Sequence, residues 1–129
     1  MVRNILSGKI HRARVTEANP DYEGSISIDP ILMEASDILP YEQVHVLDVD
    51  NGARLQTYAI PGTPHSGEIC LNGAAAKLIG KGDIVIILAY RGLSDAEARV
   101  YKPRMVYVDE QNRIVRTSYD GTMAYSRLS

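Results

Sequence analysis

The sequence predicts a small, closed β-barrel in a single domain. Three observations indicate this fold class. Apolar residues fall mainly in short β-rich runs, tight-turn dipeptides such as Asn51-Gly52 separate those runs, and the helical patterns are only one or two turns long. No strand–helix–strand rhythm is present, so a parallel α/β sheet is disfavoured, and many short strands with tight turns favour a barrel.

The first half of the chain begins with two strands and a short helix. Residues 9–16 and 25–28 alternate between apolar and polar side chains, as half-buried strands do. Asp29 and Pro30 then predict a helix, with Asp29 as the N-cap and Pro30 at the first helical position. Its expected apolar face is formed by Ile31, Leu32 and Ala35.

The middle of the chain predicts a hairpin followed by a loop. The runs 43–49 and 54–60 are rich in β-forming residues, and Asp50-Asn51-Gly52 joins them. Asn-Gly between two such runs is the strongest short hairpin signal. Residues 61–67 contain two prolines and two glycines and are expected to form a loop.

The second half predicts more short strands and a capped helix. Residues 68–71 form a strand, 72–76 turn into a helical turn, and 84–89 are apolar on both faces, as in a strand at the centre of a barrel. Residues 94–97 form a capping box that begins a short helix. Residues 105–108 and 113–116 are a last pair of strands.

Composition limits the domain count and the partners. The 129 residues, 45% hydrophobic and 23% charged, suit one soluble domain, expected over residues 1–117, with a flexible C-terminal tail at 118–129. The net charge of −2 disfavours a nucleic-acid partner. No apolar run spans a bilayer and no leader is visible, so we expect a cytoplasmic protein with no membrane partner. The single cysteine, Cys70, excludes an internal disulfide, and we expect no metal.

The dipeptide Gly24-Ser25 allows the chain to cut its own backbone. The serine hydroxyl lies next to a carbonyl that no neighbouring Cβ shields, and glycine tolerates strained conformations. Attack of Ser25 Oγ on the Gly24 carbonyl gives an ester, and elimination then leaves a dehydroalanine that hydrolyses to a pyruvoyl ketone. Gly-Ser is also an ordinary turn dipeptide, so this pair decides nothing without the rest of the chain.

Six segments occur in an order and spacing that resemble the pyruvoyl-dependent aspartate 1-decarboxylase family. They are Gly8-Lys9-Ile10-His11-Arg12, Tyr22-Glu23-Gly24-Ser25, Asn51-Gly52-Ala53-Arg54, Thr57-Tyr58-Ala59-Ile60, Asn72-Gly73-Ala74-Ala75-Ala76 and Gly82-Asp83-Ile84-Val85-Ile86. The resemblance implies a six-stranded double-psi β-barrel, cleavage between residues 24 and 25, and a homotetramer with active sites shared between subunits. It implies decarboxylation of L-aspartate to β-alanine, which feeds pantothenate biosynthesis.

The same resemblance implies roles in the reaction. Ser25 would become the covalent pyruvoyl group, which forms a Schiff base with the substrate amine and replaces pyridoxal phosphate as the electron sink. Tyr58 would return a proton to the carbanion. Thr57 would donate to the substrate and to the Gly24 carbonyl, although a regular strand turns Thr57 and Tyr58 to opposite faces. Either a bulge or a pocket built from two subunits would reconcile these positions.

The remaining candidates would bind the substrate. Arg54 and Lys9 are cations for a dicarboxylate, and Arg54 is expected on the retained β-carboxylate, since pairing with the departing carboxylate would slow its loss. The backbone N–H groups of Asn72, Gly73, Ala74 and Ala75 form a possible anion site. His11 is a second candidate for acid–base chemistry.

Each of these residues also has an ordinary structural explanation, as a packed tyrosine, a solvated cation or a satisfied histidine. Two other functions remain open at this point. One is a non-catalytic double-psi barrel that binds proteins. The other is a dimeric, swapped-hairpin transcription factor, which the acidic balance disfavours.

Overall fold

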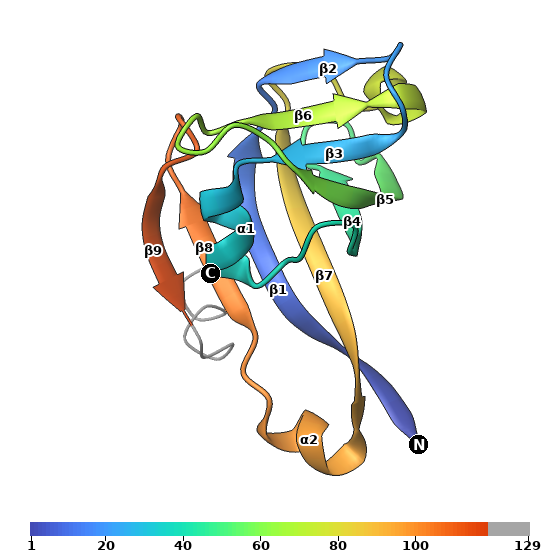
Figure 1. The fold of residues 1–129 in the computed structure, drawn as a ribbon, viewed down its shortest axis with the longest axis vertical. Helices are drawn as coiled ribbons and strands as arrows, with labels where there is room; N and C mark the ends of the chain where they lie inside the picture. Colours follow the sequence, from blue (N-terminus) through green and yellow to red (C-terminus); the bar gives the residue numbers. More distant parts are fainter. Residues whose placement is uncertain (119–129) are drawn as a thin grey trace.

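The computed structural model describes residues 1–118, which form one mainly-β domain with short helices (Figure 1). Its strands are β1 (Val2–Arg14), β2 (Glu17–Asn19), β3 (Ser25–Ile28), β4 (Gln43–Asp48), β5 (Arg54–Pro61), β6 (Ile69–Asn72), β7 (Ile84–Ser94), β8 (Arg104–Val108) and β9 (Ile114–Ser118). Two α-helices, α1 (Pro30–Ser36) and α2 (Asp95–Val100), and one 3₁₀ helix, η1 (Gly73–Lys77), connect them. Of the expected tail, 119–129 lie outside the described residues, while Ser118 ends β9.

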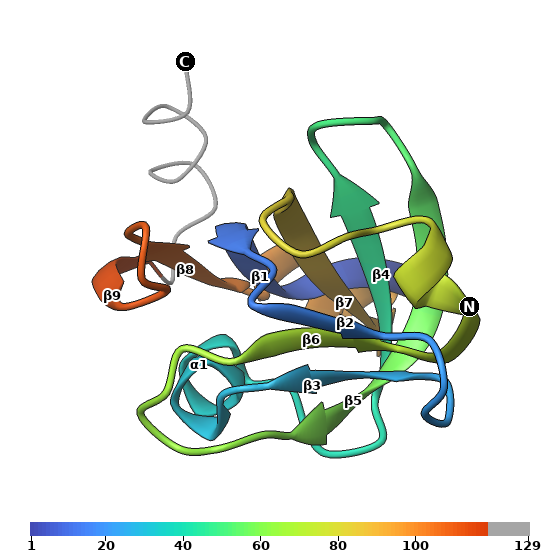
Figure 2. The ribbon, with the colours of Figure 1, turned by 90° about the horizontal axis from the view of Figure 1, so that it is seen from above.

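The barrel closes because β1 and β2 follow each other directly along the chain and together form one side of it. In the described part of the chain, the strand order is β2-β6-β3-β5-β4-β7-β1-β8-β9. Between β1 and β2, the N–H of Val15 donates to Asp83 O, and the N–H of Thr16 donates to Ile69 O. The run therefore leaves β7 and joins β6, and Figure 2 shows β2, β6 and β3 side by side. When β1 and β2 are counted as one strand, the barrel has the six strands expected. The strands β8 and β9 extend the sheet beyond β1.

Alternation along the strands builds the core. Inward side chains from six strands are fully buried, among them Ile10, Ile26, Val44, Ala59, Leu71 and Ile87. The run 84–89 was expected to be buried on both faces. The structure buries Val85, Ile87 and Ala89 fully but leaves Ile84, Ile86 and Leu88 only partly covered on the outer face of the sheet. An apolar run alone therefore overstates the burial of β7 within one chain.

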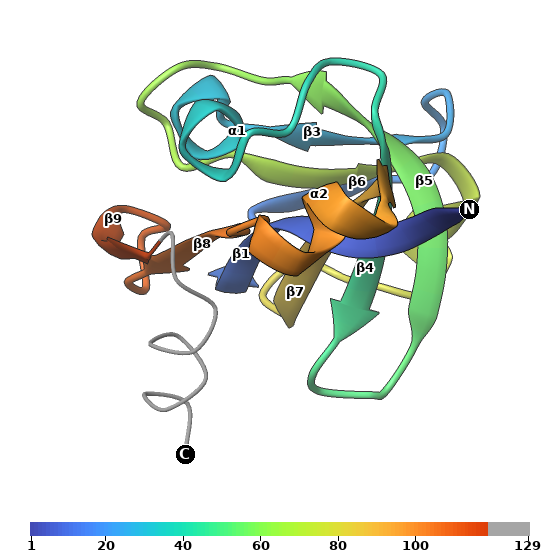
Figure 3. The same ribbon diagram turned by 90° about the horizontal axis from the view of Figure 1, so that it is seen from below.

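The strands β1 and β7 are longer than the sequence predicted. β1 begins at Val2 rather than at residue 9, and β7 runs to Ser94. The two pair antiparallel from Val2↔Ser94 onward, and this ribbon extends below the barrel to α2 (Figures 1 and 3). The first residues of β1 are mixed in polarity and exposed, so they carry no burial pattern for sequence analysis to detect. The three-residue strand β2 was missed for the same reason.

Both predicted helix caps are confirmed. Asp29 Oδ1 accepts from the N–H of Ile31, and Pro30 opens α1. The side chains of Ser94 and Glu97 form the reciprocal capping box that begins α2. The buried face of α1 differs from the expected one: Leu32, Met33 and Ser36 are buried, while Ile31 and Ala35 are half-buried. Among the described helices, none combines the length and apolar character needed to cross a membrane.

Candidate active site

Ser25 is the first residue of β3, and its side chain is buried, with 1% of the residue exposed. Its hydroxyl donates to the carbonyl oxygen of Glu23 at 3.2 Å and accepts from Nδ2 of Asn72 at 2.9 Å. The hydroxyl is therefore fixed beside the Gly24-Ser25 peptide bond rather than free in solvent. A buried hydroxyl with both kinds of partner is a positioned group, as a nucleophile must be.

The Asn72 side chain organises a polar cluster on the outer face of β3 and β6. The antiparallel register places Ser25 opposite Asn72 and Ser27 opposite Cys70, so these four side chains share one face. Asn72 Nδ2 also donates to Ser27 Oγ at 3.0 Å, and Cys70 Sγ donates to Asn72 Oδ1 at 3.3 Å. Sequence analysis proposed only the backbone of Asn72. It missed the side-chain role, which the alternation of Ser25 and Ser27 with two isoleucines on β3 could have suggested.

Gly73 packs directly against the cleavage segment. Its φ of +76° lies in the left-handed region, and a Cβ added there would meet Gly24 Cα at 2.7 Å and Gly24 N at 2.8 Å. Gly24 shows the opposite behaviour, because its φ is not in that region and an added Cβ would meet nothing within 4 Å. The conformational freedom of glycine is therefore needed at Gly73 rather than at Gly24.

A cavity of about 310 Å³ lies beside Gly24, and its size is within the range of small-molecule pockets. Several of the predicted residues meet there. The lining comes from β5, the end of β6 and η1, and comprises Gly24, Leu55, Gln56, Thr57, Asn72, Ala74, Ala75 and Leu78. The structure thus brings Thr57 and the 72–75 segment to the cleavage bond. The expected helical turn after Asn72 is a five-residue 3₁₀ helix, whose first residue is Gly73.

Tyr58 lies on the face opposite Thr57, as a regular strand requires. The β4–β5 register runs from Gln43↔Tyr58 to Leu47↔Arg54 without a shift, so no bulge turns Tyr58 toward the cavity. β5 is parallel to β3, with Ala59 beside Ile26. Extending this register by one residue brings Tyr58 level with Ser25 on the outer face. The Tyr58 ring lies 6.3 Å from that of Tyr41, between centroids.

Lys9 and Arg54 are not brought to Ser25 within one chain. Arg54 is exposed at the start of β5, and Lys9 is half-buried on β1, where burial lowers the pKa of its ammonium group. Neither residue is among those that line the cavity beside Gly24. Neither cation has an ion-pair partner in residues 1–118.

His11 lies beside Lys9 on the outer face of β1, with its ring edge-to-face to that of Tyr107 at 5.6 Å. Burial, reinforced by the charges of Lys9, Arg12 and Arg116, lowers the pKa of His11 to about 4. Its Nδ1 atom is buried without a hydrogen-bond partner among the described residues. His11 is therefore neutral at pH 7, so it could accept a proton there but does not hold an acidic one.

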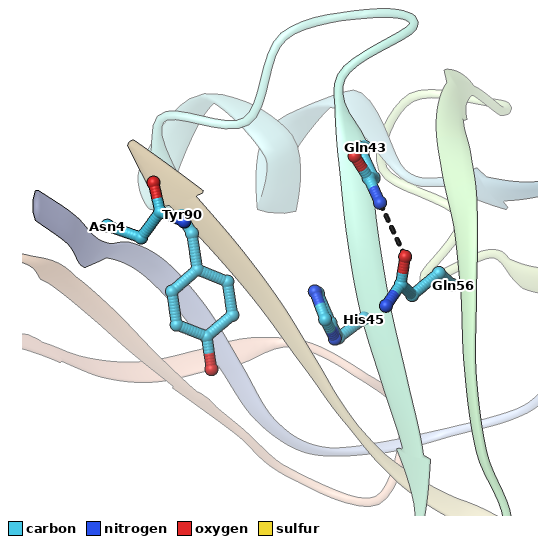
Figure 4. Close-up of a pocket in the computed structure, with 5 residues that line it drawn as sticks. All are labelled: Asn4, Gln43, His45, Gln56 and Tyr90. Atoms are coloured by element: carbon cyan, nitrogen blue, oxygen red, sulfur yellow. Dashed lines mark hydrogen bonds between the residues drawn. The ribbon is translucent and has the colours of Figure 1, made fainter. Parts of the chain in front are cut away.

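A larger cavity of about 510 Å³ lies on the outer face of the sheet, over β1, β4, β5 and β7 (Figure 4). Gln43 donates to Gln56 at 2.7 Å on one side of it, and His45 contacts the Tyr90 ring edge-to-face on the other. Its fifth lining residue is Asn4. None of these five residues was predicted to act in catalysis. The cavity shows that the outer face of the sheet is hollowed where β1, β4, β5 and β7 contribute to it.

Comparison with known proteins decides the family. The family model described as "Aspartate decarboxylase" matches residues 1–115. This chain belongs to the aspartate decarboxylase family. Curated relatives named aspartate 1-decarboxylase include proteins of Listeria monocytogenes (54% identical, covering 88% of this chain and 90% of that protein), Thermoanaerobacter pseudethanolicus (56%, 89% and 98%) and Clostridium beijerinckii (54%, 93% and 98%).

The family model spans nearly the whole described domain, including Gly24-Ser25 and every element that carries a predicted substrate-binding residue. The family resemblance first seen in six short segments is thereby confirmed. The mainly-β barrel expected for such a chain is confirmed as well.

Proposed function

We propose that this chain is an aspartate 1-decarboxylase that converts L-aspartate to β-alanine and CO₂ in the cytoplasm, supplying β-alanine for pantothenate synthesis. It matures by cutting its own backbone between Gly24 and Ser25. The observation that carries the proposal is the buried Ser25 hydroxyl, held by Asn72 beside this peptide bond in a member of the family.

Cleavage uses groups that one chain supplies. Ser25 Oγ attacks the Gly24 carbonyl carbon, the C–N bond breaks, and the nitrogen of residue 25 takes the hydroxyl proton, leaving an ester. Loss of the Ser25 Cα proton then breaks the Cβ–Oγ bond and releases Gly24 as a carboxylate. Water then adds to the resulting dehydroalanine. Its nitrogen departs as ammonia, and a ketone remains at residue 25.

The surroundings of Ser25 suit this reaction. The Asn72 amide fixes Oγ, and Gly73 lets η1 approach the Gly24 backbone closely. Thr57 lines the same cavity as Gly24, which supports its role as the donor that stabilises negative charge on the Gly24 oxygen. The cavity leaves room beside the new ketone for a small substrate.

The covalent pyruvoyl group at residue 25 supplies the electron sink for decarboxylation, so neither pyridoxal phosphate nor a metal is required for this step. Tyr58, which the β3–β5 register brings level with Ser25, returns a proton to the substrate carbon. Arg54 binds the retained β-carboxylate, because strong pairing with the departing carboxylate would oppose its loss. Lys9 adds a second positive charge.

The separation of Lys9 and Arg54 from Ser25 supports an active site shared between copies of the chain. The proposed assembly is a homotetramer. Its contacts would use the outer face of the sheet, where Leu47, Ile86 and Leu88 are only partly covered in one chain. Association would then bury apolar surface and bring the cations of one subunit toward the Ser25 segment of another.

Intact-mass spectrometry with an activity assay tests the proposal. Purified protein is expected to separate into fragments 1–24 and 25–129, and borohydride with aspartate should attach the substrate to the larger fragment and stop β-alanine release. Ser25→Ala should remain one chain and be inactive. A wild-type chain that stays whole and inactive would instead support the non-catalytic protein-binding barrel.

A further inference from the structure

We propose that Asp48, Asp50 and Asp83 form a binding site for a divalent cation of the size of Ca²⁺. The site lies where the turn after β4 meets the turn before β7. Asp48 ends β4, Asp50 follows in the hairpin turn, and Asp83 immediately precedes β7. This site is independent of the proposed decarboxylation.

The spacing of the three carboxylates suits such an ion. One ligand oxygen from each residue lies within 4.8 Å of those from the other two. Ligands of Ca²⁺ lie about 2.3–2.6 Å from the ion, so two of them can be up to about 5 Å apart. The three oxygens therefore fit within one coordination sphere without any movement of the backbone.

Backbone donors already hold each carboxylate in place. Asp48 Oδ1 accepts from the N–H groups of Asp50 and Asn51 at 2.8 and 3.2 Å. Asp50 Oδ2 accepts from Ile84 N–H at 2.9 Å, and Asp83 Oδ2 accepts from Gly80 N–H at 3.1 Å. Asp48 and Asp83 thus each use one oxygen to bind their own turn, and Asp50 uses one to bind the start of β7. The other oxygen of each residue accepts no hydrogen bond among those found in the described structure.

The buried oxygen of Asp48 is the observation that points to a ligand. Asp48 is 2% exposed, and its Oδ2 has no hydrogen-bond partner in the described structure. Such an oxygen is costly to bury without a donor or a cation beside it.

A cation would supply the partner that the buried Asp48 oxygen lacks. The cluster is open on one side, since Asp50 is exposed and Asp83 half-buried, so an ion can enter and keep water ligands. None of the three acids has an ion-pair partner within residues 1–118. The guanidinium group of Arg14 donates to the carbonyl of Gly82, the residue before Asp83.

Thermal unfolding of the full-length, EDTA-treated protein tests the site. Melting is measured in CaCl₂, MgCl₂ and NaCl at matched ionic strength, and Ca²⁺ binding is measured by calorimetry. For a Kd of about 10⁻⁴–10⁻³ M, we expect about 10 mM Ca²⁺ to raise Tm by roughly 4–10 °C, with one ion bound per chain. Mg²⁺, which needs shorter and more regular coordination, is expected to raise Tm less.

Two variants and one control make the test specific. Asp48→Asn keeps the oxygen that accepts from Asp50 and Asn51, so it should fold, melt higher than wild type without Ca²⁺, and lose the response to Ca²⁺. Asp83→Asn should lose that response as well. Glu110→Gln, which removes an exposed acid elsewhere, should retain it. The proposal is overturned if wild type does not respond to Ca²⁺, or if the two Asn variants respond as wild type does. A proton shared between Asp48 and Asp83 would then account for the buried oxygen.

Discussion

The cleavage region and the substrate-binding candidates differ in how complete they are within one chain. Around Ser25 the groups proposed for backbone cleavage lie close together: the hydroxyl is buried, Asn72 holds it, and Gly73 packs against Gly24. On the outer face, Arg54 is exposed and Lys9 is half-buried, and neither lines the cavity beside Gly24.

This difference separates the formation of the pyruvoyl group from its use in turnover. Cleavage is expected of the folded single chain, whereas turnover is expected to need the assembled protein. Substitutions near Ser25 should therefore change the fragment ratio, and substitutions on the outer face should change β-alanine release by protein that has already been cleaved.

Gly73→Ala is expected to abolish self-cleavage or nearly so. The added Cβ would meet backbone atoms of Gly24 at less than 3 Å, so the cleavage segment must move away from its present position. The matched change Gly24→Ala places its Cβ in open space and should slow cleavage by no more than about tenfold, or about 1.4 kcal/mol in activation free energy. Mass spectrometry over time gives both rates, and circular dichroism checks the fold. Equal rates in the two variants would contradict the close packing as a requirement.

Tyr58→Phe is expected to leave cleavage intact and to lower kcat by about 10²–10⁴-fold, the usual cost of losing a positioned general acid. The ring can still pack near Tyr41, since only the phenolic oxygen is lost. Both assays are made on one preparation, with borohydride trapping to show that aspartate still attaches. An uncleaved variant would show that Tyr58 is needed for cleavage. Cleavage with full turnover would show that a group other than Tyr58 returns the proton.

Arg54→Ala is expected to lower kcat/KM for aspartate by about 10–100-fold in fully cleaved protein, because a bidentate pair with the β-carboxylate contributes about 1.5–3 kcal/mol. Arg54→Lys keeps the charge without the planar fork, so its loss should be smaller. Steady-state kinetics and fragment analysis are measured together. If kcat/KM is unchanged in the alanine variant, Arg54 is an ordinary exposed cation.

His11→Gln is expected to change the pH dependence of stability rather than cleavage. The pKa of His11 is about 4 in the folded protein and 6.5 in the unfolded chain, so between these values the unfolded chain binds more protons. The free energy of unfolding therefore falls as pH is lowered from 6.5 to 4, and the variant should lose that part of the slope. Urea unfolding at several pH values measures it. Identical slopes in the two proteins would show that His11 titrates normally.

Local signals predicted the elements that one stretch of sequence determines. The Asp29 and Ser94 caps and the 50–52 turn place polar groups that satisfy neighbouring backbone atoms, so a few residues decide them. The alternation of Ser25–Ile28 likewise gave β3 its correct bounds. Barrel closure through the β1–β2 corner depends on Val15 and Thr16 bonding to residues more than fifty positions away, and no local pattern contains that information.

The candidate site divides in the same way. Gly24-Ser25 was recognised from the dipeptide and its neighbours. The hydrogen bond from the Asn72 side chain to Ser25 depends on the β3–β6 register, which brings together residues 47 positions apart. The sequence near either residue does not contain that register. The buried oxygen of Asp48 was equally hidden, because its burial follows from packing of β4 and its proximity to Asp83 from the approach of two separate turns.

The placement of β1 and β2 has a consequence for the folding of the mature protein. Both strands precede the proposed cut, yet β1 pairs with β7 and β8, and β2 pairs with β6. Cleavage would leave the small fragment threaded through the barrel that the larger one completes, so the two would stay together while folded. Once unfolded they would diffuse apart. Refolding would then become a second-order reaction, and the melting temperature of cleaved protein would depend on its concentration even within a single subunit.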